Sequence, residues 1–215
     1  MDVVLDNLDL YWRGYRFTVG LTLLAFALAF LVGTLVAAFR VSPVPPLRVA
    51  GAVWVECVRN TPLAVQMVLF YFGFTKLGIR YSAFVSAVIV LGVYTSPFLA
   101  ETIRAGINTV SRGQAEAARA IGLTFPQTLR IVVLPQAFRS VVGPIGNIFI
   151  ALIKNSSVAG GVIAVGELMR QAILLQNETA QSVSVFFGIA VAYLTLTIPA
   201  GLLFGALERR VAVRR

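Results

Sequence analysis

Long apolar runs alternate with short polar stretches along the whole chain. Phe17 to Phe39 is an uncharged run of 23 residues, enough for one helix to cross a hydrocarbon core of about 30 Å. Similar apolar stretches predict further crossings at about 53–77, 81–100, 141–165 and 183–207. The pattern therefore predicts an all-α integral membrane protein, with five transmembrane helices in one domain over residues 1–215.

The second apolar stretch is less regular than the first. Glu56 and Arg59 lie near its start, three residues apart, where they would share a helical face and could pair. Thr61-Pro62 is a reasonable helix start, and Gln66 follows one turn later. These residues either line a gate in a translocation path, or form an N-cap with a glutamine bonded between helices.

The fourth apolar stretch is interrupted by polar residues. Val141 to Ile153 holds only 13 uncharged residues, too few to cross a membrane. Four polar residues follow, namely Lys154, Asn155, Ser156 and Ser157. Either the helix continues through them or it breaks there, and a broken helix would expose backbone donors to a solute.

A lysine inside the bilayer costs roughly 2.5–3.5 kcal/mol on insertion scales, so it usually faces a cavity or a partner. One interpretation places Lys154 on a translocation path with the three polar residues that follow it. The alternative is a lysine that extends to the headgroups and pairs with an acid such as Glu167. A second candidate pair, Glu101 and Arg104, lies three residues apart at the end of the third stretch.

Residues 105–139 form the longest polar insertion. Good helix formers over 112–123 predict a short helix that stops at Gly122. A second helical piece is expected to contain Pro126 in its first turn and to end at Pro135. The insertion reads as a helix–turn–helix outside the apolar layer that presents a rigid surface to a partner.

Composition supports the membrane assignment and excludes several activities. Hydrophobic residues make up 58% and charged residues 13% of the chain, and the mean hydropathy is +0.86. The lack of histidine and the single Cys57, interpreted as a small buried residue, argue against a disulfide, a multi-cysteine metal site and most catalytic schemes. The net charge is +9, but the sequence contains no basic surface stretch interleaved with aromatic residues. We therefore expect no nucleic acid partner.

The distribution of basic residues predicts the orientation. With the N-terminus outside, twelve Lys and Arg residues fall in cytoplasmic segments and five in outer segments, with Lys154 in the membrane. The insertion at 105–139 and the C-terminus are then cytoplasmic. No basic start or cleavage site of a signal peptide is present, so Met1 to Arg16 is expected to stay attached.

The insertion resembles the EAA loop of permease subunits in ABC importers. The resemblance rests on Glu116-Ala117-Ala118, then Gly122 after three residues, then Val132-Val133-Leu134-Pro135 after nine more. It extends to Arg59-Asn60-Thr61-Pro62-Leu63, Gln66, Gly113-Gln114-Ala115, Lys154-Asn155-Ser156-Ser157 and Glu167-Leu168, and covers nearly all of residues 17–207. Together these segments are similar to the polar amino-acid uptake branch of that family, in which Gly is common at Asn60 and Asp-Thr at Asn155-Ser156.

The resemblance implies a type I importer permease that works as a dimer, with itself or a sister permease, in the bacterial cell membrane. It implies two ABC ATPase subunits and an extracytoplasmic amino-acid-binding protein as partners. The implied ATPase-coupling residues are Gly113, Glu116, Ala117, Ala118, Gly122, Leu134 and Pro135. The expected substrate path contains Lys154, Asn155, Ser156, Ser157, Thr61 and Gln66.

No GxxxxGK[ST] segment occurs, so ATP and Mg would be bound by the separate ATPase, and we expect no catalytic residue, cofactor or metal on this chain. The permease itself would not be an enzyme. A polar amino acid is the expected substrate, with glutamate or glutamine favoured because Lys154 suits a carboxylate. A secondary transporter or channel not driven by ATP is the alternative function, and a membrane-embedded enzyme is a third.

Overall fold

Four long helices dominate the computed structural model, which describes residues 2–211. They are α2 (Leu8–Val41), α6 (Ala83–Asn108), α9 (Leu134–Ile163) and α11 (Ser182–Val211). Each is apolar and long enough to cross a bilayer, α9 together with the turn that precedes it. The remaining helices are short: α1 (Asp2–Leu5), α3 (Pro45–Arg59), α4 (Leu63–Val68), α5 (Phe74–Lys76), α7 (Arg112–Ala120), α8 (Phe125–Gln127) and α10 (Leu168–Thr179). Two π-helical segments, η1 (Leu69–Gly73) and η2 (Thr128–Val133), complete the described chain.

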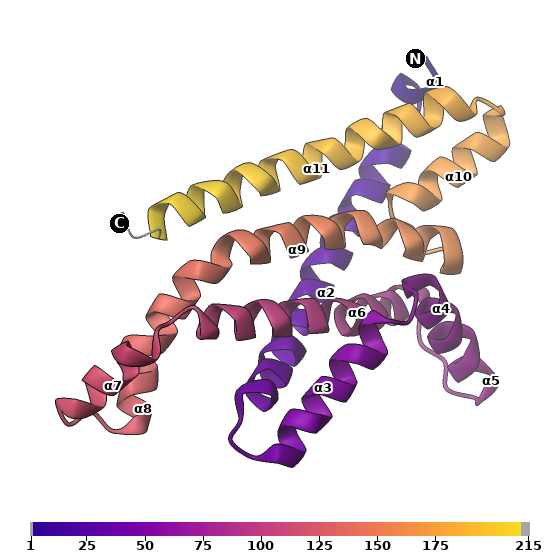
Figure 1. Ribbon diagram of the computed structural model, residues 1–215. Helices are drawn as coiled ribbons and strands as arrows, with labels where there is room; N and C mark the ends of the chain where they lie inside the picture. The colour runs from indigo at the N-terminus through magenta and orange to yellow at the C-terminus, as the bar shows by residue number, and fades with distance from the viewer. Residues whose placement is uncertain (1, 212–215) are drawn as a thin grey trace.

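The long helices cross one another in a layered bundle (Figure 1). Helix α2 packs extensively on α6, α6 packs on α9, and α11 lies along the other side of α9. The main core lies where α2, α4, α6 and α9 meet, around the fully buried Leu21, Met67 and Leu91. Helices α7 and α8 protrude at one end of the bundle, beyond the ends of α6 and α9.

Small residues allow the helices to approach closely. A Cβ atom at Gly33 of α2 would lie 2.8 Å from the Leu99 side chain and from the Ser96 carbonyl oxygen of α6. A Cβ at Gly106 of α6 would overlap the side chain of Val141 on α9. Such contacts bring helix backbones together where a larger residue would hold them apart.

The ends of α2 and α6 are joined by charged side chains. The predicted pair forms: Arg104 donates to Glu101 Oε2 across 2.6 Å. Arg40 of α2 also donates to Glu101, from Nε to Oε1 across 3.1 Å. Glu101 therefore accepts hydrogen bonds from α2 and from its own helix, α6. It links the two helices and also pairs with the charge of Arg104.

The second crossing differs from the prediction. Residues 53–77 are not one helix, because α3 ends at Arg59 and a new helical segment begins at Leu63. The apolar segment Leu63–Lys76 belongs to the class of 10–17-residue helices, so it is shorter than the four spanning helices. Proline at position 62 has no N–H to donate and disfavours a helical conformation at Thr61, which accounts for the interruption. The class of fold is as expected, but the count of five uninterrupted spanning helices is wrong.

Candidate functional site

The polar insertion folds as a short exposed helix followed by a tight turn. Helix α7 begins after Ser111 and ends near Ile121, and Gly122 follows with φ of +90°. That conformation favours glycine, so Gly122 stops the helix as predicted. The Leu123 amide then donates to the Ala118 carbonyl across 3.1 Å, which closes the turn.

The surface of α7 divides into two faces. Ala118 is 5% exposed and packs inward. Gly113, Glu116, Ala117 and Gly122 are exposed, and Ile121 is 80% exposed. A carboxylate, small side chains and a large apolar side chain therefore share an uncovered surface at the end of the bundle.

The second half of the insertion does not end at Pro135. The helix runs without interruption from Phe125 through α8, η2 and α9 to Ile163. Leu134 and Pro135 lie in the first turn of α9, immediately after the wider π-helical turn of η2. That turn accommodates the missing proline N–H, and Gln136 Nε2 donates to the Val132 carbonyl across 2.9 Å. The second half of the insertion is thus the start of the fourth crossing rather than a separate short helix.

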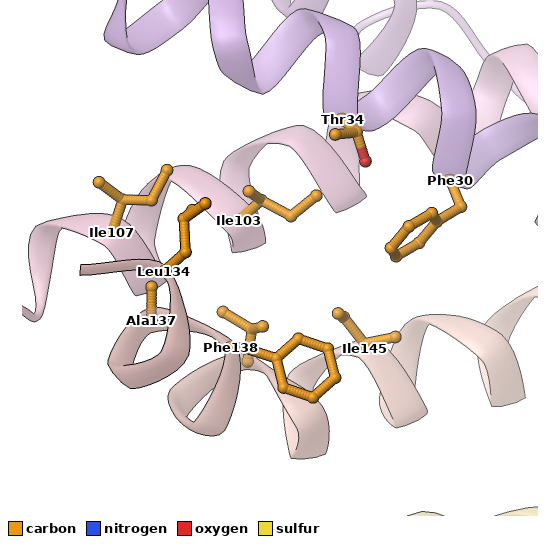
Figure 2. A pocket seen from close by; sticks show the side chains of 9 residues that line it. Phe30, Thr34, Ile103, Ile107, Leu134, Ala137, Phe138 and Ile145 are labelled. Atoms are coloured by element: carbon orange, nitrogen blue, oxygen red, sulfur yellow. The ribbon is translucent and has the colours of Figure 1, made fainter. Parts of the chain in front are cut away.

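An apolar cavity of about 280 Å³ lies beside this junction, between α2, α6 and α9. Figure 2 shows Phe30, Ile103, Leu134 and Phe138 directed toward it. Thr34 contributes the one side-chain hydroxyl of its lining. A polar amino acid would lose its hydration there without replacement hydrogen bonds, so this cavity does not fit a polar substrate.

The predicted break at Lys154 does not occur. Helix α9 continues through Lys154, Asn155, Ser156 and Ser157 and ends at Ala164, which has φ of 56°. Ser156 donates to the Ile153 carbonyl and Ser157 to the Lys154 carbonyl, each across 2.7 Å. Because their hydroxyls bond within the helix, the serines do not interrupt it. Ser156 is fully buried and therefore does not face a path in this structure.

Lys154 is exposed on the surface of the single chain. Glu167, its proposed partner, is 0% exposed and accepts instead from the Tyr193 hydroxyl and from the Arg170 amide, across 2.5 and 3.0 Å. Burial raises the pKa of Glu167 above its usual value, although the hydrogen bonds from Tyr193 and the α10 backbone oppose the shift. The pairing of Lys154 with Glu167 is therefore wrong, and Glu167 caps α10.

A more polar hollow of about 360 Å³ lies between α6 and α9. Helix α6 contributes Tyr94, Thr95 and Phe98, and α9 contributes Asn147 and Asn155 among apolar neighbours. Two carboxamides, a phenol and a hydroxyl can each exchange hydrogen bonds with a small polar solute. Of the expected path residues, Asn155 alone lines this hollow. Asn147, a single amide within an apolar stretch, was a signal that sequence reasoning missed.

Thr61 and Gln66 donate hydrogen bonds to backbone carbonyls at the interruption of the second crossing. Thr61 Oγ1 donates to the Cys57 carbonyl across 2.8 Å. Gln66 Nε2 donates to the carbonyls of Val58 and Thr61 across 2.9 and 3.1 Å. Both side chains thus satisfy the free carbonyls at the end of α3. Thr61 is not an N-cap, since α4 has no side-chain cap, and Gln66 does bond between helical segments.

Two further expectations fail near this interruption. Glu56 does not pair with Arg59: its Oε2 accepts from Asn60 Nδ2 across 3.0 Å. The guanidinium of Arg59 instead lies over the ring of Phe98, with Cζ 5.2 Å from the ring centroid. Cys57 is exposed rather than buried. Among residues 2–211, no group of three or more His, Cys, Asp or Glu side chains is placed to hold a metal ion.

An all-helical bundle with an exposed short helix at one end and a polar hollow between its crossings defines a membrane-embedded transport subunit. The chain belongs to the family described as binding-protein-dependent transport system inner membrane component, whose model matches residues 17–213. It is embedded in the membrane, as its apolar helices require.

Curated relatives place the chain among permease subunits rather than enzymes. It is 40% identical over 211 residues to a probable glutamine ABC transporter permease protein, GlnM, of Bacillus subtilis, covering 98% of this chain and 97% of that one. It is also 40% identical over 213 residues to a glutamate transport system permease protein, GluC, of Corynebacterium glutamicum, covering 92% of each.

A solved structure agrees with the fold. The crystal structure of an amino acid ABC transporter with histidines superimposes with a TM-score of 0.90 at 34% identity, covering 96% of each chain. The fold is therefore that of type I ABC importer permeases, as the residues of the insertion predicted.

Proposed function

We propose that this chain is the permease subunit of an ATP-driven importer of a polar amino acid, with glutamate or glutamine favoured. The observation that carries the proposal is similarity over more than nine-tenths of the chain to glutamine and glutamate permeases. The exposed face of α7, which carries the Glu116 carboxylate, supports it, because a separate ATPase subunit needs an accessible surface to bind. Two carboxamides beside the α6–α9 hollow, with Lys154 exposed on α9, suit a solute that carries a carboxylate.

The proposed assembly contains two such permeases, either identical or sister chains, two ABC ATPases and an extracytoplasmic amino-acid-binding protein. ATP and Mg are bound by the ATPases. The chain lies in the cytoplasmic membrane with its N-terminus outside and α7 in the cytoplasm. Of the twelve basic residues expected on the inner side, the structure places Arg59 beside the middle of α6, so eleven remain inside against five outside.

Transport proceeds by alternating access. The ATPases close on ATP, each moving the α7 it holds, and that motion opens the path toward the binding protein. Hydrolysis returns the path to the inward-open state. The permease breaks no covalent bond; it couples the ATPase equilibrium to that of the solute.

The test combines uptake with association. Glu116→Lys reverses the charge on the exposed face of α7, and we expect at least about a 10-fold loss of ATPase association and of uptake. The measurements are co-purification of the ATPase and uptake of a labelled amino-acid panel by proteoliposomes that contain the binding protein.

Glu178→Lys is the matched control, because Glu178 is an exposed glutamate on α10, in a different part of the chain from α7. Its co-purification with the ATPase should remain at the wild-type level. Uptake by the wild type that continues without ATP would overturn the proposal in favour of a secondary transporter or channel.

A further inference from the structure

An arginine lies deep in the membrane-spanning part of the bundle. Phe98 is close to the middle of the 26-residue α6, about 22 Å along the axis from its first residue and about 15 Å from its last. The Arg59 guanidinium carbon lies 5.2 Å from the centroid of this ring. Arg59 is therefore far from either end of α6, although its place in the sequence suggested a position at the membrane surface.

No acid of the described chain neutralises this charge. Across residues 2–211, ion pairs occur only between Glu101 and its partners Arg40 and Arg104. Glu56, the nearest acid in sequence, is bonded to Asn60. A charged side chain at membrane depth without a counter-ion is a strong indication of a site for a solute of opposite charge.

The aromatic ring beneath Arg59 is also a wall of the polar hollow. Phe98 lines that hollow together with Asn147 and Asn155. Arg59 is not itself a lining residue, but it contacts a ring that is, so a cation lies one side chain away from the two carboxamides. This set of donors fits a carboxylate, since the planar guanidinium can give two parallel hydrogen bonds to its oxygens.

The contact between Arg59 and Phe98 is one that a solute can displace. Arg59 is exposed and is the last residue of α3, directly before the interruption at Asn60–Pro62. A cation held over a ring is bound more weakly than one that makes charge-assisted hydrogen bonds to a carboxylate.

We propose that Arg59 is a specificity-determining residue that binds the carboxylate of the transported solute through two hydrogen bonds, and that the ring of Phe98 holds it when the hollow is empty. The inference rests on the proposed function and adds a solute contact to it. The carboxylate is either the α-carboxylate of any amino acid or the side-chain carboxylate of an acidic one.

Uptake kinetics in proteoliposomes that contain the whole transporter and its binding protein test this assignment. Arg59→Gln removes the charge, and we expect the KM for glutamate to rise about 10-fold or more with a smaller change in maximal rate. Arg59→Lys keeps the charge but loses the planar fork, so its KM should lie between the two. An equal rise for glutamate and glutamine identifies the α-carboxylate, and a rise confined to glutamate identifies the side chain.

A control variant and a stability measurement separate solute binding from a structural role. Arg48→Gln changes another exposed arginine of α3 and should leave the KM unaltered. Thermal unfolding of the transporter with Arg59→Gln should match that of the wild type, because the exposed Arg59 makes no ion pair that the substitution would break. If Arg59→Gln lowers the unfolding temperature as well as raising the KM, the stacked pair is structural and the inference is wrong.

The remaining outcomes are also decisive. Unchanged kinetics in Arg59→Gln, with an active wild type, overturns this inference and leaves the proposed function standing. A wild type that takes up no amino acid refutes both. If Arg59→Gln does not assemble, Arg59→Lys decides, because a raised KM supports the two-hydrogen-bond contact and an unchanged KM overturns it.

Discussion

Two adjacent glycines of α9 have very different surroundings. Glu167 places its carboxylate against Gly160, and a Cβ there would overlap Glu167 Oε1. A Cβ at Gly161 would meet no atom of a neighbouring element within 4 Å. The buried carboxylate therefore depends on the absence of a side chain at position 160 and is indifferent to position 161.

Gly160→Ala should lower the free energy of unfolding by about 1–3 kcal/mol, because the added methyl overpacks a buried site. Gly161→Ala is the control and should be neutral or stabilising by up to about 1 kcal/mol, because alanine is the better helix former. Thermal unfolding of both purified variants measures the difference. Equal effects of the two substitutions would contradict this packing of Glu167 on α9.

At the scale of single elements, the interruption occurs in a different crossing from the one expected. The polar run after Ile153 suggested a broken fourth helix, yet its serines bond to carbonyls of the same helix and α9 continues. The break lies at Asn60–Pro62, where Thr61 and Gln66 satisfy the exposed carbonyls. Proline chemistry is local and can be read from the sequence, whereas the partner of a serine hydroxyl depends on the backbone around it.

Gln66→Leu should destabilise the protein by about 1–3 kcal/mol. It leaves the Thr61 carbonyl without its side-chain donor and the Val58 carbonyl with only the long bond of 3.4 Å from the Thr61 amide. Val65→Leu, a change at the neighbouring exposed position, should stay within about 0.5 kcal/mol of the wild type. Denaturant or thermal unfolding in detergent compares the two. A Gln66→Leu protein as stable as the control would mean that other groups or water satisfy those carbonyls.

For the whole molecule, the sequence was sufficient for the class, the family and the exposed helix α7. Apolar runs and the spacing of Glu116 and Gly122 are local signals, and both carry over directly into the structure. The polar hollow was only partly predictable. Asn155 was singled out, and Asn147 lies eight residues before it on the same helix, a spacing that the sequence does contain. Phe98 joins them only through the packing of α6 on α9, which has no signature in a single sequence.

The orientation of the bundle in the membrane can be tested by cysteine labelling. In a Cys57→Ser background, Arg80→Cys precedes α6 and Ser111→Cys follows it, so the two positions lie beyond opposite ends of one spanning helix. Because basic residues concentrate on the cytoplasmic side, an impermeant maleimide should label position 80 in intact cells and position 111 only after permeabilisation. The reverse pattern would place α7 outside the cell and out of reach of an ATPase.

The unbroken course of α9 has a mechanical consequence. Its 30 residues span about 45 Å, with the turn at Gly122 before one end and Lys154 two-thirds of the way along. Pro144 lies inside this helix and removes one backbone hydrogen bond, yet the helix is continuous on both sides of it. A rotation applied beside α7 would therefore be carried along one helix as far as Lys154 and Asn155. The neighbouring crossing is divided at Asn60–Pro62, so no single helix runs through it.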